Sequence, residues 1–209
     1  MIKLIIFDLD NTLFDTYSQL GVKILDEMIY RMRKAGLKKE QEEIIKQKYP
    51  FTGFRILARE LKLSDRIKKI GVSAYEEMDL SGIRSYDDVV VIGELEQKKV
   101  LVTSGTQRIQ MNKVRILGIQ HLFEDMIVDE TNSVEGRKNI FSELANKHNV
   151  KPSEVIIIGD NPEVELAAGK SLGMTTIHVV RRENTLRGEA DYRVKDLYEV
   201  KKILDGLRK

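Results

Sequence analysis

The sequence KLIIFDLDNTLF, at residues 3–14, is an apolar run that ends in two aspartates, Asp8 and Asp10, with only Leu9 between them. Two carboxylates this close disfavour each other's ionisation. They cost stability unless a cation, hydrogen-bond donors or a shared proton stabilises them. The pair is therefore either the solvated end of a strand or part of a reaction centre, and the rest of the chain decides between these two interpretations.

The composition indicates a packed globular protein. The 209 residues suffice for a full hydrophobic core, 42% of them are apolar, and there is no repeat or low-complexity tract. The 35 basic and 33 acidic residues are interspersed, so the chain lacks the basic stripe that nucleic-acid binding usually needs. A high content of charged residues without Cys also fits a heat-adapted source.

The absence of Cys excludes disulfides, thiolate metal sites and a Cys nucleophile. The sequence enters a strand without a basic and apolar leader, and no apolar run approaches the roughly 18 residues that span a bilayer. We therefore expect a cytoplasmic protein with no membrane or nucleic-acid partner, present as a monomer or homodimer. Its chemistry is expected to use oxygen and nitrogen groups.

Short, nearly continuous apolar runs recur along the chain, which is typical of strands covered on both faces. We predict strands at residues 3–8, 98–104, 125–130, 154–160, 174–180 and 191–195. Helical patterns occupy residues 106–118, 136–148, 162–172 and 196–208. This alternation predicts an α/β fold, a Rossmann-like three-layer sandwich with a parallel sheet.

Residues 16–85 differ, because they lack apolar strand runs and are dense in helical periodicity. An apolar stripe at helical spacing runs over residues 24–32. Further helices are expected at residues 40–48, 54–62 and 64–78, the last with Ser64 as N-cap. We therefore predict a core domain of residues 1–15 and 86–209, with a small all-helical cap domain, residues 16–85, inserted after the first strand.

In open parallel sheets the reaction site lies beyond the carboxyl ends of the strands, near the point where strand order reverses. Polar residues stand at four predicted strand ends: Asp8 and Asp10, Thr103 and Ser104, Asp129 and Glu130, and Asp160 with Asn161. We expect these ends to converge on one cleft.

Hard oxygen ligands without His or Cys suit Mg²⁺. With that cation on Asp8, Asp10 and Asp160, Asp8 could act as a nucleophile and Asp10 could exchange a proton. The alternative for Asp160 is a purely structural role, as the cap of a helix that begins near Pro162.

Three of these segments resemble the haloacid dehalogenase-like superfamily. DLDNTLFDT resembles its first motif, VLVTSG its second, and IIIGDNPEVELAAGKSLGM its fourth, in which Glu165 follows Asp160 as a second acid. The resemblance covers about residues 1–15 and 86–208, and the helical block occupies the slot of the family's helical cap. It identifies the chain as similar to the phosphatases of subfamily I.

The resemblance implies a role for each matched residue. Asp8 is expected to form an aspartyl-phosphate, and Asp10 to protonate the leaving alcohol and later to activate water. Thr103, with Ser104 beside it, is expected to bind the phosphoryl group. Mg²⁺ would be held by Asp8, the main-chain carbonyl of Asp10, and Asp160. The residues expected to support these ligands are Glu165, Asn161 and Thr12.

The third motif of the family is a Lys that neutralises the phosphoryl oxygens, and its usual Lys-Pro pairing is absent here. The segment SVEGRKNIF offers Lys138 and Arg137. We choose Lys138, because it lies three residues before Phe141 as in family members without the Lys-Pro form. The alternative for Lys138 is a solvated surface lysine.

The second aspartate favours phosphoryl chemistry, since family members that dehalogenate small acids lack it. We therefore predict a Mg²⁺-dependent phosphatase that hydrolyses a small phosphorylated metabolite. The alternatives are a 2-haloacid dehalogenase, a phosphomutase or a non-catalytic metabolite sensor on the same core.

The sequence says little about substrate selection or about the remaining polar residues. In YPFTGFR, residues 49–55, we hypothesise that Arg55 binds an anionic group remote from the transferred phosphate, against the alternative of a solvated Arg. Three scattered histidines, His121, His148 and His178, are expected in surface or core positions without a catalytic role.

Overall fold

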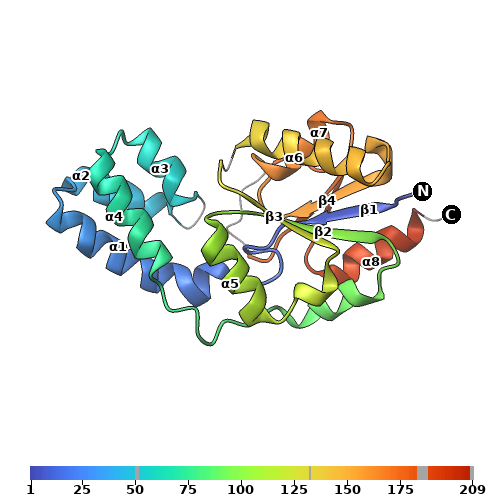
Figure 1. Cartoon of the computed structure of the whole chain (residues 1–209), viewed down its shortest axis with the longest axis horizontal. Coiled ribbons are helices and arrows are strands. Elements are labelled where there is room, and N and C mark those ends of the chain that lie inside the picture. Colours follow the sequence, from blue (N-terminus) through green and yellow to red (C-terminus); the bar gives the residue numbers. More distant parts are fainter. Residues whose placement is uncertain (50–51, 132, 183–187, 208–209) are drawn as a thin grey trace. The chain divides into compact units, whose positions relative to one another are not determined.

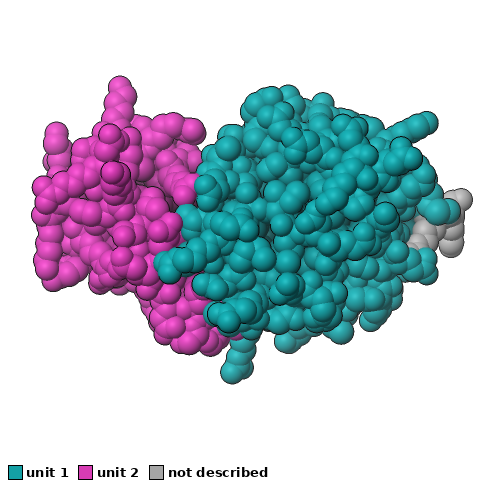
Figure 2. Space-filling view, viewed as in Figure 1, with its two compact units in different colours: residues 1–15, 84–209 teal, residues 16–83 magenta. Residues whose placement is uncertain are grey.

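The computed structural model describes residues 1–49, 52–131, 133–182 and 188–207 (Figure 1). Its contacts divide the chain into two compact units, residues 1–15 with 84–209 and residues 16–83 (Figure 2). The first boundary coincides with the expected one. The second lies two residues earlier than expected. The role of residues 16–83 as a cap stays a prediction.

The larger unit is built on a parallel sheet. The strands in the described part of the chain are β1 (Leu4–Phe7), β2 (Lys98–Ser104), β3 (Asp125–Asp129), β4 (Val155–Gly159), β5 (Thr175–Val179) and β6 (Tyr192–Val194). Their order is β3-β2-β1-β4-β5-β6, and every neighbouring pair is parallel. Each strand falls within a segment predicted from the sequence. Because β1 lies between β2 and β4, the strand order reverses beside it, and ligands bind at such a point in open sheets.

Helices cover both faces of this sheet, as the three-layer prediction requires. They are α5 (Gln107–Leu117), α6 (Val134–Lys147), α7 (Glu165–Ser171) and α8 (Leu197–Gly206), with short turns η2 (Asp87–Glu94), η3 (Gln120–Leu122) and η4 (Pro152–Glu154). In Figure 1, α6 and α7 lie on one face and α5 and α8 on the other. Helix α7 begins later than expected, since the Asn161 side chain accepts the Glu163 N–H (2.9 Å) and holds a turn before it.

The core explains why the strands are apolar along their whole length. On the face covered by α6 and α7, alternate strand residues such as Ile6, Val102 and Ile157 pack with Phe141 and Leu166. The residues between them point to the opposite face and are equally buried. Those that are fully inaccessible to solvent include Ile5, Phe7, Leu101, Ile156 and Ile158. A strand buried on both faces has no position for a regular polar residue until it ends.

The smaller unit is helical in all its regular elements among the described residues. They are η1 (Tyr17–Gly21), α1 (Val22–Lys34), α2 (Lys39–Lys48), α3 (Phe54–Glu60) and α4 (Asp65–Glu76). The predicted stripe on α1 is confirmed, since Ile24, Met28, Ile29 and Met32 are buried. Ser64 caps α4 as expected, accepting the Ile67 N–H at 3.4 Å. Among the described residues of both units, no helix is long and apolar enough to cross a membrane.

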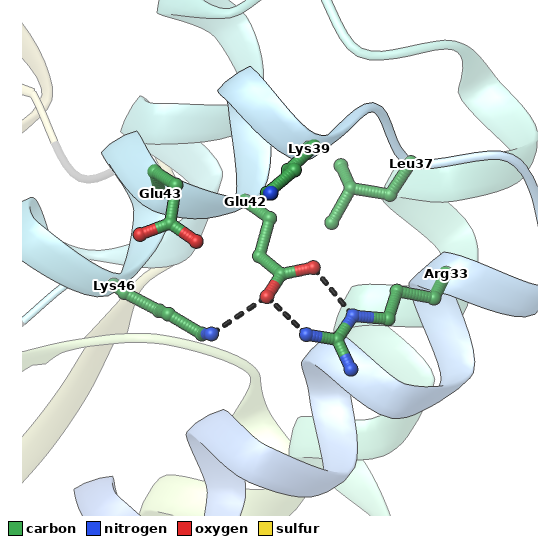
Figure 3. Close-up of a pocket in the computed structure, with 6 residues that line it drawn as sticks. All are labelled: Arg33, Leu37, Lys39, Glu42, Glu43 and Lys46. Atoms are coloured by element: carbon green, nitrogen blue, oxygen red, sulfur yellow. Dashed lines mark hydrogen bonds and ion pairs between the residues drawn. The ribbon is translucent and has the colours of Figure 1, made fainter.

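A hollow on the surface of the helical unit is dominated by charged side chains from α1 and α2 (Figure 3). Glu42 is buried, and its carboxylate pairs with Arg33 and with Lys46, whose Nζ lies 2.6 Å away. Hydrogen bonds from these two cations lower the pKa of Glu42 to about 2. Both oxygens of the Glu42 carboxylate are therefore paired with cations.

Candidate active site

The turn after β1 places Asp8 beside β4. The Asp8 N–H donates to the Ile158 carbonyl at 2.8 Å, and the buried Thr12 hydroxyl donates to Asp8 Oδ2 at 3.4 Å. Asn11 has φ +59°, a left-handed conformation that Asn tolerates better than most residues. Thr12 therefore contacts the expected nucleophile directly, and its N–H closes the turn on the Leu9 carbonyl at 3.3 Å.

A buried ion pair that was not predicted from the sequence contacts this turn. Arg181 donates to the Thr12 carbonyl at 2.9 and 3.2 Å and pairs with both oxygens of Asp88 at 2.6 and 3.0 Å. Asp88 also accepts the Leu197 N–H at 2.7 Å, and the Arg181 guanidinium lies 4.2 Å from the centre of the Tyr86 ring. Bidentate Arg–carboxylate pairs have well-defined geometry, so the turn is anchored to η2 and α8.

Three acids meet at the ends of β1 and β4. One carboxylate oxygen from each of Asp8, Asp160 and Glu165 lies within 4.8 Å of the others. Burial is the largest cause that raises the pKa of Asp8 and of Asp160 well above their ordinary values, and repulsion from Glu165 is the next largest. Burial likewise raises the pKa of Glu165. Crowded carboxylates of this kind fit a divalent cation with oxygen ligands, as predicted for Asp8 and Asp160.

Glu165 is fixed by the backbone that it faces. The Asn161 N–H donates to Glu165 Oε1 at 2.6 Å, so Asn161 supports the cluster through its main chain. A Cβ on Gly159 would lie 2.6 Å from the same oxygen, so any larger residue there would displace the Glu165 carboxylate. The buried His178 reaches the Asp160 carbonyl through Nε2 at 3.0 Å, and burial lowers the pKa of His178. His178 is thus a core residue, as expected, and it lies against the site.

Of the two cations that the predicted third motif offers, the structure places Arg137 rather than Lys138 beside Asp8. Lys138 pairs with Glu135 at 3.3 Å and keeps about a third of its side chain exposed. Arg137 is buried, and its Nη2 lies 3.4 Å from Asp8 Oδ1. The reason is helical periodicity, because Arg137 shares the buried stripe of α6 with Phe141, Leu144 and Ala145, whereas Lys138 lies one position round the helix.

Arg137 contacts groups from two strands, β2 and β3. Its Nη1 donates to the Val102 carbonyl at 2.6 Å and its Nη2 to the Ser104 hydroxyl at 2.9 Å. Its Nε lies 3.4 Å from Asp129 Oδ2, an ion pair that explains the buried acid at the end of β3. Asp129 is fixed in turn, because its Oδ1 accepts the N–H and hydroxyl of Thr131. The predicted convergence of strand ends is thus seen in direct contacts.

The Asp10 carboxylate lies outside the three-acid cluster and contacts α5. Lys113 Nζ lies 2.6 Å from Asp10 Oδ1, and Gln110 Nε2 donates to Asp10 Oδ2 at 2.7 Å. The same Gln110 nitrogen donates to the Thr103 hydroxyl. Neither residue was predicted from the sequence. The available signal was their place on the buried stripe of α5, between Ile109 and Val114, where a Gln and a Lys are unusual.

Arg55 is exposed on α3, in the helical unit. Its proposed role in substrate selection stays a prediction. Within YPFTGFR, Pro50 and Phe51 lie outside the described residues.

Comparisons with known proteins agree with this geometry. The haloacid dehalogenase-like hydrolase family matches residues 5–179. The chain belongs to this family. A glyceraldehyde 3-phosphate phosphatase of Methanopyrus kandleri is 30% identical over 87% of the chain and 85% of its own length. A glyceraldehyde 3-phosphate phosphatase of Methanocaldococcus jannaschii is 28% identical over the full length of both proteins.

A solved structure shows the same haloacid dehalogenase-like fold. The phosphatase of this family from Thermococcus onnurineus has a TM-score of 0.68 and 22% identity, over 97% of this chain and 98% of its own. The curated relatives also confirm the predicted activity class, a phosphatase, and they do not favour the dehalogenase, mutase or sensor alternatives. The family and fold inferred from the motifs are therefore confirmed.

Proposed function

We propose that this phosphatase works through an aspartyl-phosphate on Asp8, with Asp10 as general acid and base and Arg137 as the fixed cation. The observation that carries the proposal is the contact of Arg137 with Asp8 Oδ1, beside the three-acid cluster. This contact supports Asp8 as the reacting carboxylate, because a cation is held next to it. The roles predicted for Lys138, in catalysis and in phosphate binding, pass to Arg137.

The proposed reaction has two steps. In the first, an Asp8 carboxylate oxygen attacks phosphorus, the phosphorus–oxygen bond to the substrate breaks, and the departing alcohol takes a proton from Asp10. In the second, water attacks the phosphorus of the aspartyl-phosphate while Asp10 takes a proton from it. Inorganic phosphate leaves, and the Asp8 carboxylate is restored. Arg137, Thr103 and Ser104 lie where they can stabilise negative charge on the phosphoryl oxygens.

The cation proposed for the cluster is Mg²⁺, held by Asp8, Asp160 and the main-chain carbonyl of Asp10. When bound, Mg²⁺ supplies positive charge that lets the phosphoryl group approach an ionised carboxylate. Glu165 is proposed to orient the loop that carries Asp160, because its carboxylate accepts the Asn161 N–H. Thr12 is proposed to hold Asp8 through its hydroxyl.

The proposed substrate is a small phosphorylated metabolite. Two relatives that match most of the chain are named for glyceraldehyde 3-phosphate, so a three-carbon sugar phosphate is the first candidate.

The test measures inorganic phosphate released from glyceraldehyde 3-phosphate, from p-nitrophenyl phosphate and from a panel of other phosphate esters. Each is assayed with Mg²⁺ and with a chelator. We expect wild type to act only with the metal and Asp8→Asn to be inert. Acid quenching during turnover of a ³²P-labelled ester should trap labelled wild-type protein and leave Asp8→Asn unlabelled. Equal inactivity of both proteins over the whole panel contradicts the proposal.

A further inference from the structure

We propose that Gln110 and Lys113 are positioning residues, which hold the Asp10 carboxylate beside Thr103 so that proton transfer and phosphoryl binding occur in a fixed geometry. The inference rests on the proposed function, since it assigns these two residues to the same reaction. Both lie on α5, and neither has any exposed surface.

The contacts of Lys113 indicate that its ammonium group holds Asp10. Its Nζ lies 2.6 Å from Asp10 Oδ1 and 5.5 Å from the centre of the Phe14 ring. Taking an ammonium fully out of water is costly, and a surface lysine would avoid that cost. The Asp10 side chain keeps a quarter of its surface exposed, so Lys113 contacts it without enclosing it.

Gln110 connects Asp10 with the phosphoryl-binding strand end. The Gln110 amide nitrogen donates to Asp10 Oδ2 at 2.7 Å. The other N–H of that nitrogen donates to Thr103 Oγ1. Thr103 therefore accepts from Gln110, and its own O–H is left to donate to a phosphoryl oxygen. One amide orients both the proton-transfer group and the phosphate-binding group.

The loop between β2 and α5 packs against the Gln110 side chain. Gly105 has φ +148°, and a Cβ at that position would lie 2.9 Å from Gln110 Cγ. The side chain is thus packed directly on the backbone that follows Thr103 and Ser104. This packing restricts the Gln110 rotamer and keeps its amide between Asp10 and Thr103.

The first experiment uses the dependence on leaving group. A p-nitrophenolate leaves as a stable anion, whereas an alkoxide needs a proton from Asp10, and kcat/KM reports the steps up to the aspartyl-phosphate. We expect Lys113→Met to lower kcat/KM about 100-fold for an alkyl phosphate such as glycerol 3-phosphate, and less than about 5-fold for p-nitrophenyl phosphate. Gln110→Met, which keeps the side-chain length, should lower kcat/KM for both esters because Gln110 also orients Thr103, and it should lower the value more for the alkyl phosphate. Equal losses for the two esters overturn the proposal.

Arg115→Met, on the exposed side of the same helix, is the matched control, and it should leave both values unchanged. Thermal melting identifies any variant that has lost its fold. If Lys113→Met fails to fold, Gln110→Met carries the same test.

A double-mutant cycle separates this inference from the proposed function. In an Asp10→Asn background the residues have no carboxylate to position, so adding Lys113→Met should lower kcat/KM for the alkyl phosphate less than about 3-fold. If the loss of kcat/KM in the double variant equals the product of the losses in the two single variants, Lys113 acts independently of Asp10, and the inference is overturned. Full activity of Asp8→Asn instead overturns the proposed function, whatever the cycle gives.

Discussion

Two clusters of charged side chains in this protein invite comparison. In the helical unit, Glu42 lies between Arg33 and Lys46, and hydrogen bonds lower its pKa to about 2 (Figure 3). In the α/β unit, Asp8 and Asp160 crowd together with Glu165, and burial raises the pKa of each well above its ordinary value. In the first cluster two cations stabilise one carboxylate, whereas the second carries more negative charge than its surroundings stabilise.

The difference separates a structural cluster from one that is prepared for a ligand. The Glu42 carboxylate already has two cationic partners, so it gives no reason to expect a bound metal ion. A buried cluster with excess negative charge lowers the free energy of unfolding. Binding of a cation, or catalysis of phosphoryl transfer, explains why a protein keeps such a cluster. The four predictions below test this contrast, in order of decreasing effect.

Asp8→Asn should give the largest effect. We expect activity to fall by about 10⁴-fold or more, because the substitution removes the proposed nucleophile. In the metal-free protein at neutral pH the same change should raise the melting temperature by about 2 to 4 °C, because it removes one buried charge from the crowded cluster. Phosphate release and calorimetry measure the two effects. A metal-free variant less stable than wild type contradicts the unbalanced cluster.

Arg137→Met should lower kcat by about 10² to 10³-fold, because it removes a fixed cation from the phosphoryl oxygens. Lys138→Met is the matched control, and its kcat should change less than about 2-fold, in the range of surface substitutions. Since Arg137 contacts four groups, circular dichroism must first show that the variant is folded. A larger loss for Lys138→Met restores the original choice from the sequence.

Mg²⁺ should stabilise the α/β unit, because it neutralises the crowded acids. At 100 times its Kd, a ligand of the folded state adds about 2.7 kcal/mol. We expect a rise in melting temperature of roughly 5 to 10 °C for wild type. Asp160→Asn should abolish most of the shift, whereas Glu42→Gln should keep it. An equal shift in all three proteins points to a metal site elsewhere.

Glu42→Gln should have the smallest effect, about 1 kcal/mol of unfolding free energy, since its partners are largely exposed. The pKa of Glu42 is lowered from its ordinary 4.5 to about 2, so its ion pairs stabilise the fold above pH 4.5. That contribution is lost as the pH falls from 4.5 towards 2. Urea unfolding at pH 7 and pH 2.5 should therefore show a difference between wild type and variant that shrinks in acid. A constant difference refutes the lowered pKa.

The fold could be predicted from the sequence because the strands carry an unambiguous pattern. A continuous apolar run such as residues 154–160 has few alternatives to a doubly covered strand, and β4 occupies Val155–Gly159 within it. The strand ends followed from the same reasoning, since parallel strands bring Asp8, Thr103 and Asp160 to one edge of the sheet.

The cations were harder to predict because helical side chains are placed by burial as well as by spacing. Arg137 and Lys138 are adjacent in the sequence, and only the buried stripe of α6 separates the residue beside Asp8 from the one paired with Glu135. Gln110 and Lys113 were missed for a related reason. A polar residue on an apolar stripe is usually a solvated exception, and its partner Asp10 lies about 100 residues away in the sequence.

The position of β1 in the middle of the sheet also has a consequence for biosynthesis. Asp8 leaves the ribosome early, but the acids that crowd it, Asp160 just after β4 and Glu165 at the start of α7, are made much later. The repulsion among them therefore arises only once β4 has paired with β1, when most of the sheet is already available to offset it. The nascent chain can thus complete much of its core before its most costly charges meet.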